Sequence, residues 1–247
     1  MLPMKKLFIP VALTASIVLL ASCHGKKLRG KGEKVTNQVA ITAVDDLDIE
    51  ASVKTIITVT PGAQPSLKLM GYGNILQHIK TSVQGYKLRV YTDLDNSWSI
   101  DKHDGTTIEL VLPSLANLDF SGASDAEIHG SVTGPKFHTS ISGSGKLVAD
   151  NISATEFSTE ISGAADVDVK GGTVQKVDYE ISGAGKVSSF PLQAADVSVS
   201  ISGAAKADIT AIHSLAVSIS GAGKIKYKGH PTITKDISGA GSIRDVN

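Results

Sequence analysis

The chain has 247 residues, and 24 basic residues (Lys and Arg) balance 24 acidic ones (Asp and Glu), giving a formal net charge of zero. This balance excludes the strong positive field that draws proteins to nucleic acid, so nucleic acid is not an expected partner. Aromatic residues make up only 4% of the chain, which argues against a conventional globular core and favours stacked small and β-branched side chains.

Residues 1–22 have the pattern of a lipoprotein signal peptide. Two lysines precede a nearly continuous apolar run from Leu7 to Leu20, and this run is shorter than a typical membrane-spanning helix. The run ends in Leu-Ala-Ser-Cys, which resembles a lipobox, the signal for cleavage before a lipidated cysteine. Cys23 is the only cysteine and therefore has no disulfide partner. We expect it to be the lipidation site that anchors the chain to a membrane.

Residues 23–36 are predicted to be a tether. The sequence HGKKLRGKGEK from His24 to Lys34 is basic and punctuated by glycine, a composition typical of a flexible linker.

Residues 37–118 are predicted to be a region of β-strands that forms the first, broader coils and caps one end of the fold. Apolar or β-branched runs are separated by turn-forming residues such as Pro61-Gly62, the pattern of strands joined by turns. The predicted strands are Thr55–Thr60, Leu67–Met70, Tyr86–Tyr91 and Thr107–Leu112.

The longest loop of this region, within residues 95–105, contains the only cluster of residues that suggests chemistry. Trp98 lies near Asp101, His103 and Asp104, and such side chains can bind a sugar or a metal ion. A plain polar turn has the same composition. The seven histidines are scattered without the spacing of a zinc site, so no metal or cofactor is expected.

Residues 119–247 contain a Ser-Gly pair that recurs about every 20 residues. The intervals between successive pairs are 21, 20, 20, 20, 18 and 18 residues. A fixed period of this length is typical of a solenoid, whose coils bury their apolar faces only against their neighbours. The apolar residues that precede the pairs are Phe120, Ile141, Ile161, Ile181, Ile201, Ile219 and Ile237.

Alternation of apolar and polar residues on both sides of each pair indicates strands. A third apolar position recurs at Ile152, Val174, Leu192 and Ile212, which suggests three short sides per coil. We therefore predict an all-β fold, a parallel β-helix (β-solenoid) with 18–21 residues per coil. It should be right-handed, because parallel crossovers nearly always are.

The Ser-Gly pairs are expected to be structural corners of the coils. Neighbouring strands lie about 4.8 Å apart, so glycine is needed where the chain bends close to the coil above it. A row of catalytic serines would need a base in every coil, and none recurs. The corners are Ser121-Gly122, Ser142-Gly143, Ser162-Gly163, Ser182-Gly183, Ser202-Gly203, Ser220-Gly221 and Ser238-Gly239.

A column of charged residues follows the corners. Aspartate and lysine alternate along its first part, which allows ion pairs between neighbouring coils. Its later part, Lys186, Lys206 and Lys224, places like charges on adjacent coils and suggests a basic stripe for an acidic glycan, a lipid head group or a partner protein. The alternative is three solvated lysines. The whole column is Asp125, Lys146, Asp166, Lys186, Lys206, Lys224 and Ser242.

From about Asp45 to Ile243 the chain resembles the "putative auto-transporter adhesin, head GIN domain" family, exported proteins of Gram-negative bacteria. The resemblance rests on TIITVTPG from Thr55, GYKLRV from Gly85, IELVLPSLANLDFSGASD from Ile108, and the ISGAGK-type repeats. It implies a β-helical, non-enzymatic lipoprotein with an adhesive role, and it brings no catalytic residues.

Two functions are compatible with these features. The first is a lipid-anchored structural or binding module of the cell envelope that holds a glycan or another envelope protein. The alternative is a carbohydrate-active enzyme of the polysaccharide lyase or hydrolase type, because such enzymes also use β-helices. Its site would lie in the 95–105 loop or on one face of the helix. The monotonous corners and short turns favour the binding module.

The expected location is the outer membrane. Surface-exposed lipoproteins of bacteria that carry this family resemble one another in an acidic cluster after the lipidated cysteine, whereas His24-Gly25-Lys26-Lys27 follows Cys23 here. The sequence therefore leaves both sides of the outer membrane open, and it does not indicate an oligomeric state.

Overall fold

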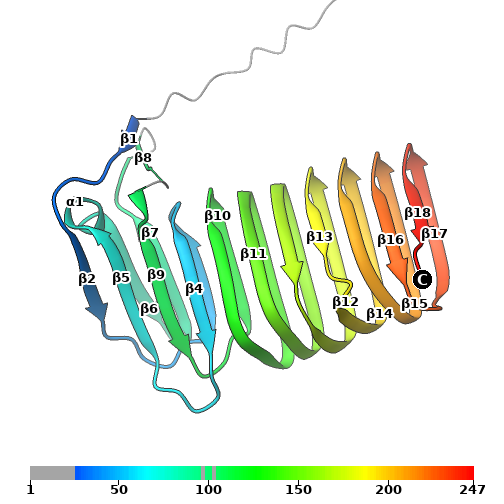
Figure 1. The fold of residues 1–247 in the computed structure, drawn as a ribbon, viewed down its shortest axis with the longest axis horizontal. Coiled ribbons are helices and arrows are strands. Elements are labelled where there is room, and N and C mark those ends of the chain that lie inside the picture. The colour runs from blue at the N-terminus through cyan, green and yellow to red at the C-terminus, as the bar shows by residue number, and fades with distance from the viewer. Residues whose placement is uncertain (1–25, 96–97, 102–103) are drawn as a thin grey trace, which may run out of the picture.

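The computed structural model describes residues 26–95, 98–101 and 104–247. The predicted signal peptide, Cys23 and His103 lie outside these residues. Strands make up 73% of the structure and helix 2%, and the parallel coils stack into a β-solenoid of about 6 turns, which confirms the predicted fold class. Figure 1 shows the coils side by side in chain order from β10 to β18. No helix in the described part of the chain is long and apolar enough to cross a membrane.

Each regular coil forms two faces that meet at a Ser-Gly pair. The entry face contains the strand segments that precede the pair, and the exit face contains those that follow it; β11 and β15 are long enough to contribute to both. The strands of the regular part are β10 (Asn117–Gly122), β11 (Asp125–Val169), β12 (Gly172–Gly183), β13 (Lys186–Ser188), β14 (Leu192–Gly203), β15 (Lys206–Gly221), β16 (Lys224–Lys228), β17 (Thr232–Gly239) and β18 (Ser242–Asp245).

The register between coils follows the sequence period. Ile181 lies opposite Ile161 on one side and Ile201 on the other, and the pairing continues through Ile219 to Ile237. The predicted repeat is thereby confirmed residue by residue. Because side chains alternate across a strand, the residues two positions before each isoleucine also point inward.

The interior is a column of small and β-branched side chains with one aromatic cluster. Val177, Tyr179 and Ile181 are each no more than 2% exposed. The rings of Phe137 and Phe157 stack with centroids 5.5 Å apart, and Phe157 meets Tyr179 edge to face at 5.9 Å. Three aromatic side chains of the repeat region, Phe137, Phe157 and Tyr179, thus pack together in three neighbouring coils.

The prediction that Ile152, Val174, Leu192 and Ile212 occupy one recurring apolar position is only partly correct. Ile152 and Leu192 both lie opposite Gly172, whereas Val174 belongs to a second column two residues further on. In the shorter coil that follows, Ala211 and not Ile212 takes the buried place, and Ile212 is 43% exposed. The register shifts here because the coil has lost residues at this corner.

The N-terminal strands do not follow chain order. β3 (Asp46–Glu50) lies between β7 (Lys87–Thr92) and β10. On the exit face, β4 (Lys54–Val59) lies between β9 (Thr107–Leu112) and β11. β3 and β4 are therefore enclosed on both sides by strands that follow them in the chain, an order that local sequence does not specify.

Antiparallel strands close the N-terminal end of the stack. β5 (Ser66–Tyr72) pairs antiparallel with β9, and β2 (Lys34–Val39) pairs antiparallel with β5. On the entry face, β6 (Ile79–Gln84) forms an antiparallel pair with β7. A four-residue helix, α1 (Gly73–Leu76), follows β5 where only a break was expected.

A small projection completes this end. β1 (Lys26–Leu28) pairs in parallel with β8 (Trp98–Ile100), and these two strands form a sheet separate from the solenoid. Figure 1 shows them above the N-terminal coils, at the opposite end of the stack from β17 and β18.

Candidate functional site

The Ser-Gly corners lie where the chain passes from the entry face to the exit face. Gly183 has a φ of 131°, a backbone angle that L side chains rarely adopt. A Cβ on Gly183 would lie 2.3 Å from the carbonyl oxygen of Gly163 in the preceding coil. The equivalent contact recurs at 2.2 to 2.7 Å along Gly143, Gly163, Gly183, Gly203, Gly221 and Gly239.

The serines of the corners point outward. Ser162 and Ser182 are exposed and line a shallow hollow of about 240 Å³ on the entry face, together with Glu160 and Glu180. The two glutamates lie opposite each other on neighbouring strands. None of the described residues that line this hollow is a histidine or lysine, the bases that usually activate a serine nucleophile.

The predicted basic stripe forms a ladder on the exit face. Lys186 lies opposite Lys206, and Lys206 lies opposite Lys224; all three side chains are exposed. We call Lys186, Lys206 and Lys224 the lysine ladder. Among the residues that the structure describes, none carries a carboxylate within ion-pair distance of these ammonium groups. Even Asp166, directly opposite Lys186, forms no such pair.

The ladder is the edge of a larger cationic surface that the sequence interpretation missed. Lys226 and Lys228 follow Lys224 at alternate positions of β16 and are exposed, and Arg244 lies opposite Lys226. The ammonium of Lys228 lies 5.0 Å from the ring centroid of Phe190. One acidic side chain, Asp208, lies opposite Lys226 on its other side. The sequence could have revealed these lysines through the alternation of lysine with other residues in KIKYK, because alternate residues of a strand share a face.

We call the lysine ladder together with Lys226, Lys228 and Arg244 the basic patch. Its members are Lys186, Lys206, Lys224, Lys226, Lys228 and Arg244.

The predicted site around Trp98 is divided by the structure. The carboxylate of Asp104 accepts a hydrogen bond of 2.7 Å from the backbone N–H of Gly30. Asp101 is buried and lies 3.6 Å from the guanidinium of Arg29. Both carboxylates therefore attach the tether to the loop, and they do not converge with Trp98 on a common cleft.

Trp98 instead borders a hollow of about 360 Å³, whose lining also includes Leu28, Leu94 and His78. The indole is 39% exposed, and the ammonium of Lys26 lies 5.4 Å from the centroid of its ring system. Two aspartates, Asp93 and Asp95, complete the lining.

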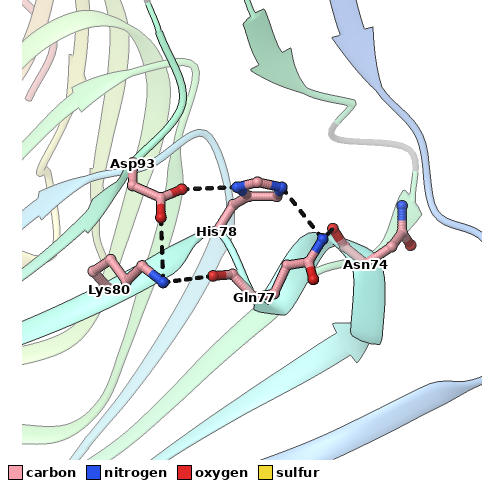
Figure 2. Close-up of polar contacts among 5 residues, drawn as sticks. All are labelled: Asn74, Gln77, His78, Lys80 and Asp93. Carbon is pink, nitrogen blue, oxygen red and sulfur yellow. Dashed lines mark hydrogen bonds and ion pairs between the residues drawn. The ribbon is translucent and has the colours of Figure 1, made fainter.

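His78 and Asp93 form a polar network that sequence analysis did not detect (Figure 2). His78 Nδ1 lies 2.8 Å from Asp93 Oδ1, and Lys80 Nζ lies 3.2 Å from Asp93 Oδ2. Lys80 also donates a hydrogen bond of 2.7 Å to the carbonyl of Gln77. The hydrogen bond from His78, assisted by Lys80, lowers the pKa of Asp93 below its ordinary value.

The network contains a His–Asp pair like those of some catalytic sites, but its contacts hold neighbouring structural elements together. The second ring nitrogen of His78 lies 3.4 Å from the side-chain amide nitrogen of Gln77, so both ring nitrogens already have partners. The contacts connect the end of α1 with β6 and with the residue that follows β7. No sequence motif marks this pair, because its members are brought together by the β6–β7 hairpin.

Metal binding has no support in the described part of the chain, where no group of three or more His, Cys, Asp or Glu side chains could hold an ion.

A family model described as "putative auto-transporter adhesin, head GIN domain" matches residues 45–231. A structure of a putative adhesin from Bacteroides fragilis is similar, with 20% identity and a TM-score of 0.76, covering 89% of this chain and 100% of that chain. A putative adhesin from Parabacteroides distasonis has 18% identity and a TM-score of 0.71, with coverage of 90% and 100%. No curated protein matches.

A third similar structure, a putative lipid binding protein from Parabacteroides distasonis, has 22% identity and a TM-score of 0.66, with coverage of 90% of this chain and 100% of that chain. At these identities the likeness of all three structures establishes a common fold.

Proposed function

The chain belongs to the "putative auto-transporter adhesin, head GIN domain" family, and from this premise we propose that it is an adhesin-like binding module of the cell envelope. In this proposal residues 1–22 are a cleaved signal peptide, Cys23 carries the lipid anchor and residues 23–36 are the tether, which is not a free linker because it contains β1 and the beginning of β2. Residues 37–118 form the first coils and the cap, and residues 119–247 form the regular solenoid.

The lysine ladder is the observation that supports binding most directly. Strands in neighbouring coils lie about 4.8 Å apart, and like charges directly opposite each other destabilise a sheet. An arrangement of this kind becomes favourable when an anion lies across it. A linear acidic glycan fits the ladder best, because its repeated carboxylate, sulfate or phosphate groups can meet one lysine after another, whereas a single small anion neutralises only one or two.

Catalysis has less support. Polysaccharide hydrolases hold a pair of carboxylates on either side of the scissile bond, in a cleft that encloses the sugar chain. Here Asp101 and Asp104 are engaged with the tether, and His78 is held from both sides. The glutamates beside the serine corners line an open, shallow hollow that does not enclose a sugar chain.

The test is retention of the purified protein on a panel of acidic and neutral polysaccharides, with cleavage scored in the same samples. Replacing Lys186, Lys206 and Lys224 with serine should weaken retention on acidic glycans roughly tenfold, since each exposed pair contributes about 0.5 kcal/mol. Retention should also fall as salt is added.

A matched control replaces three exposed lysines elsewhere, Lys68, Lys136 and Lys176, with serine and should leave retention unchanged. Equal losses in both triple variants would contradict a specific role for the ladder. Turnover of any polysaccharide that is abolished by Asp101→Ala or Asp104→Ala would establish an enzyme instead.

We further propose that the anchor lies in the outer membrane. Protease treatment of intact cells distinguishes its two sides, because a protein on the cell surface is degraded and a protein facing the periplasm survives. Survival would argue against adhesion to external surfaces and would leave an envelope glycan as the ligand.

A further inference from the structure

The β1–β8 projection has features of a membrane interface. Lys26, Lys27, Arg29 and Lys31 are all exposed, and the stretch from Lys26 to Lys31 contains no acidic residue. Trp98 is paired with Lys26 in the same small sheet and is partly exposed. Indole rings and lysines are characteristic of the membrane–water boundary, where the apolar part of each side chain is shielded and the polar end remains hydrated.

The projection also lies within reach of the proposed anchor, on which this inference rests. Lys26 is only three positions after Cys23, and an extended chain spans at most about 3.5 Å per residue. Lys26 is therefore within roughly 11 Å of an acylated Cys23. That distance is close to the thickness of the head-group layer and to the range over which charges act at physiological salt.

The acidic residues nearby are largely compensated by their own contacts. Asp93 is held by His78 and Lys80. Asp104 accepts the N–H of Gly30, and Asp101 lies beside Arg29. Asp95 lines the hollow next to Trp98. Among the described residues, Lys26, Lys27 and Lys31 form no ion pair with a carboxylate, so their side chains can contact a surface outside the protein.

Apolar side chains lie beside these charges. Leu28 and Leu94 line the same hollow as Trp98, and both are only partly buried against the core. The projection therefore combines partly exposed apolar side chains, a tryptophan and lysines, a composition typical of surfaces that bind at the membrane interface.

We propose that the β1–β8 projection docks on the surface of an anionic lipid bilayer, with Trp98 at the level of the head groups. The lipid anchor then fixes an orientation, and the basic patch lies at the far end of the solenoid from the membrane, as the order of strands in Figure 1 indicates.

Trp98 reports on this contact directly, because it is the only tryptophan in the chain. The experiment uses the acylated protein reconstituted in phosphatidylcholine vesicles with and without phosphatidylglycerol. Flotation of the vesicles establishes anchoring. Spin-labelled lipids that carry the quencher near the head group or deep in the acyl chain then report the depth of the indole.

We expect the emission of Trp98 to shift to shorter wavelength in the anionic vesicles and to be quenched most by the shallow label. Replacing Lys26, Lys27 and Lys31 with serine should weaken docking about 100-fold, because each juxtamembrane lysine strengthens binding about fivefold. The control replaces Lys224, Lys226 and Lys228 with serine, which removes the same charge at the far end and should leave quenching unchanged.

Protein that floats with the vesicles while Trp98 stays unquenched would overturn the docking proposal and leave the anchor intact. Equal loss of quenching in both triple variants would overturn it as well, because general charge would then explain the result. A protein that is not acylated and does not float would overturn the anchor and the docking together. Binding of acidic glycans by the lysine ladder is measured separately and is independent of these outcomes.

Discussion

Lys235 lies directly opposite Val217, at a position whose side chain faces the interior in the preceding coils. Val217 and Val199 are 4% and 1% exposed, and Tyr179 continues the same column. On the last coil this position is exposed, so the open end of the core carries an ammonium group. Inward-facing charge on a terminal strand discourages further pairing.

Replacing Lys235 with valine should therefore promote self-association through the C-terminal end. Pairing of two such ends would bury an ammonium group in the native chain, a penalty that the variant lacks. We expect self-association at least tenfold stronger, measured by sedimentation velocity over a range of protein concentrations. Lys226→Val removes the same charge from an outward position and should stay at the native level. If both variants associate equally, surface hydrophobicity and not the column explains the effect.

The corner glycines should be far less tolerant of substitution than a turn glycine with the same sign of φ. Gly183→Ala places a Cβ against the backbone of the neighbouring coil, and two close-packed strands cannot separate locally without losing hydrogen bonds. We expect a loss of about 3 kcal/mol or more, since the backbone strain alone contributes about 1–2 kcal/mol. Gly62 has a φ of 76° and nothing within 4 Å of its added Cβ.

Gly62→Ala should therefore show only the strain, about 1 kcal/mol. Thermal unfolding of both variants provides the comparison, with a shift of roughly 2–4 °C for each kcal/mol in a chain of this size. Equal shifts would mean that the contact between coils is easily relieved.

Asp93 should stabilise the fold only above the pH range in which it titrates. Its folded-state pKa is lowered from 3.8 by His78 and Lys80, so the stability it contributes is complete above the unfolded-state pKa and is lost as the pH falls through the folded-state value. Asp93→Asn should lower the melting temperature slightly at pH 7 and have no effect at the lowest pH. A difference that persists in strong acid would indicate a role other than charge.

Asp119 should have the opposite effect. It lies opposite Asp48 on the neighbouring strand, and one of its oxygens is buried without a hydrogen-bond partner. Burial, reinforced by Asp46 and Asp48, raises its pKa above 3.8, although His138 and Lys87 oppose the shift. Its ionisation therefore destabilises the fold above the unfolded-state pKa, and this effect disappears below it.

Asp119→Asn should accordingly raise the melting temperature at pH 7, and the two proteins should converge as the pH falls below the ordinary aspartate range. The comparison requires thermal unfolding at several pH values. A variant that is less stable than the native protein at pH 7 would show that the carboxylate makes a favourable contact.

The regular coils were predictable because the same local pattern recurs in each of them. Phe120 and Ile141 to Ile237 occupy one column in the structure, as the alternation of apolar and polar residues requires. The insertion of β3 between β7 and β10 was not predictable, since it depends on pairing between segments far apart in the chain. Ile212 was misplaced because deletion of residues at a corner changes which neighbour faces inward.

The candidate sites differ in the same respect: the site that follows the repeat was predictable from the sequence, and the site that depends on contacts between distant residues was not. The lysine ladder follows from the period, and its lysines lie opposite one another as the spacing requires. Lys226, Lys228 and Arg244 were overlooked because only one column of the exit face was followed. The contact between His78 and Asp93 has no periodic signal in the sequence. It could not be predicted because it forms only when the β6–β7 hairpin brings the two residues together.

The repeated in-register contact also has a consequence for how such a chain can change in length. Each regular coil meets only the coils beside it, so duplication of one 20-residue segment would add a coil without disturbing the two ends. Every added coil moves the C-terminal tip about 4.8 Å farther along the axis. The reach of the protein can therefore be adjusted in small, equal steps while the cap at one end and the charged terminus at the other are kept.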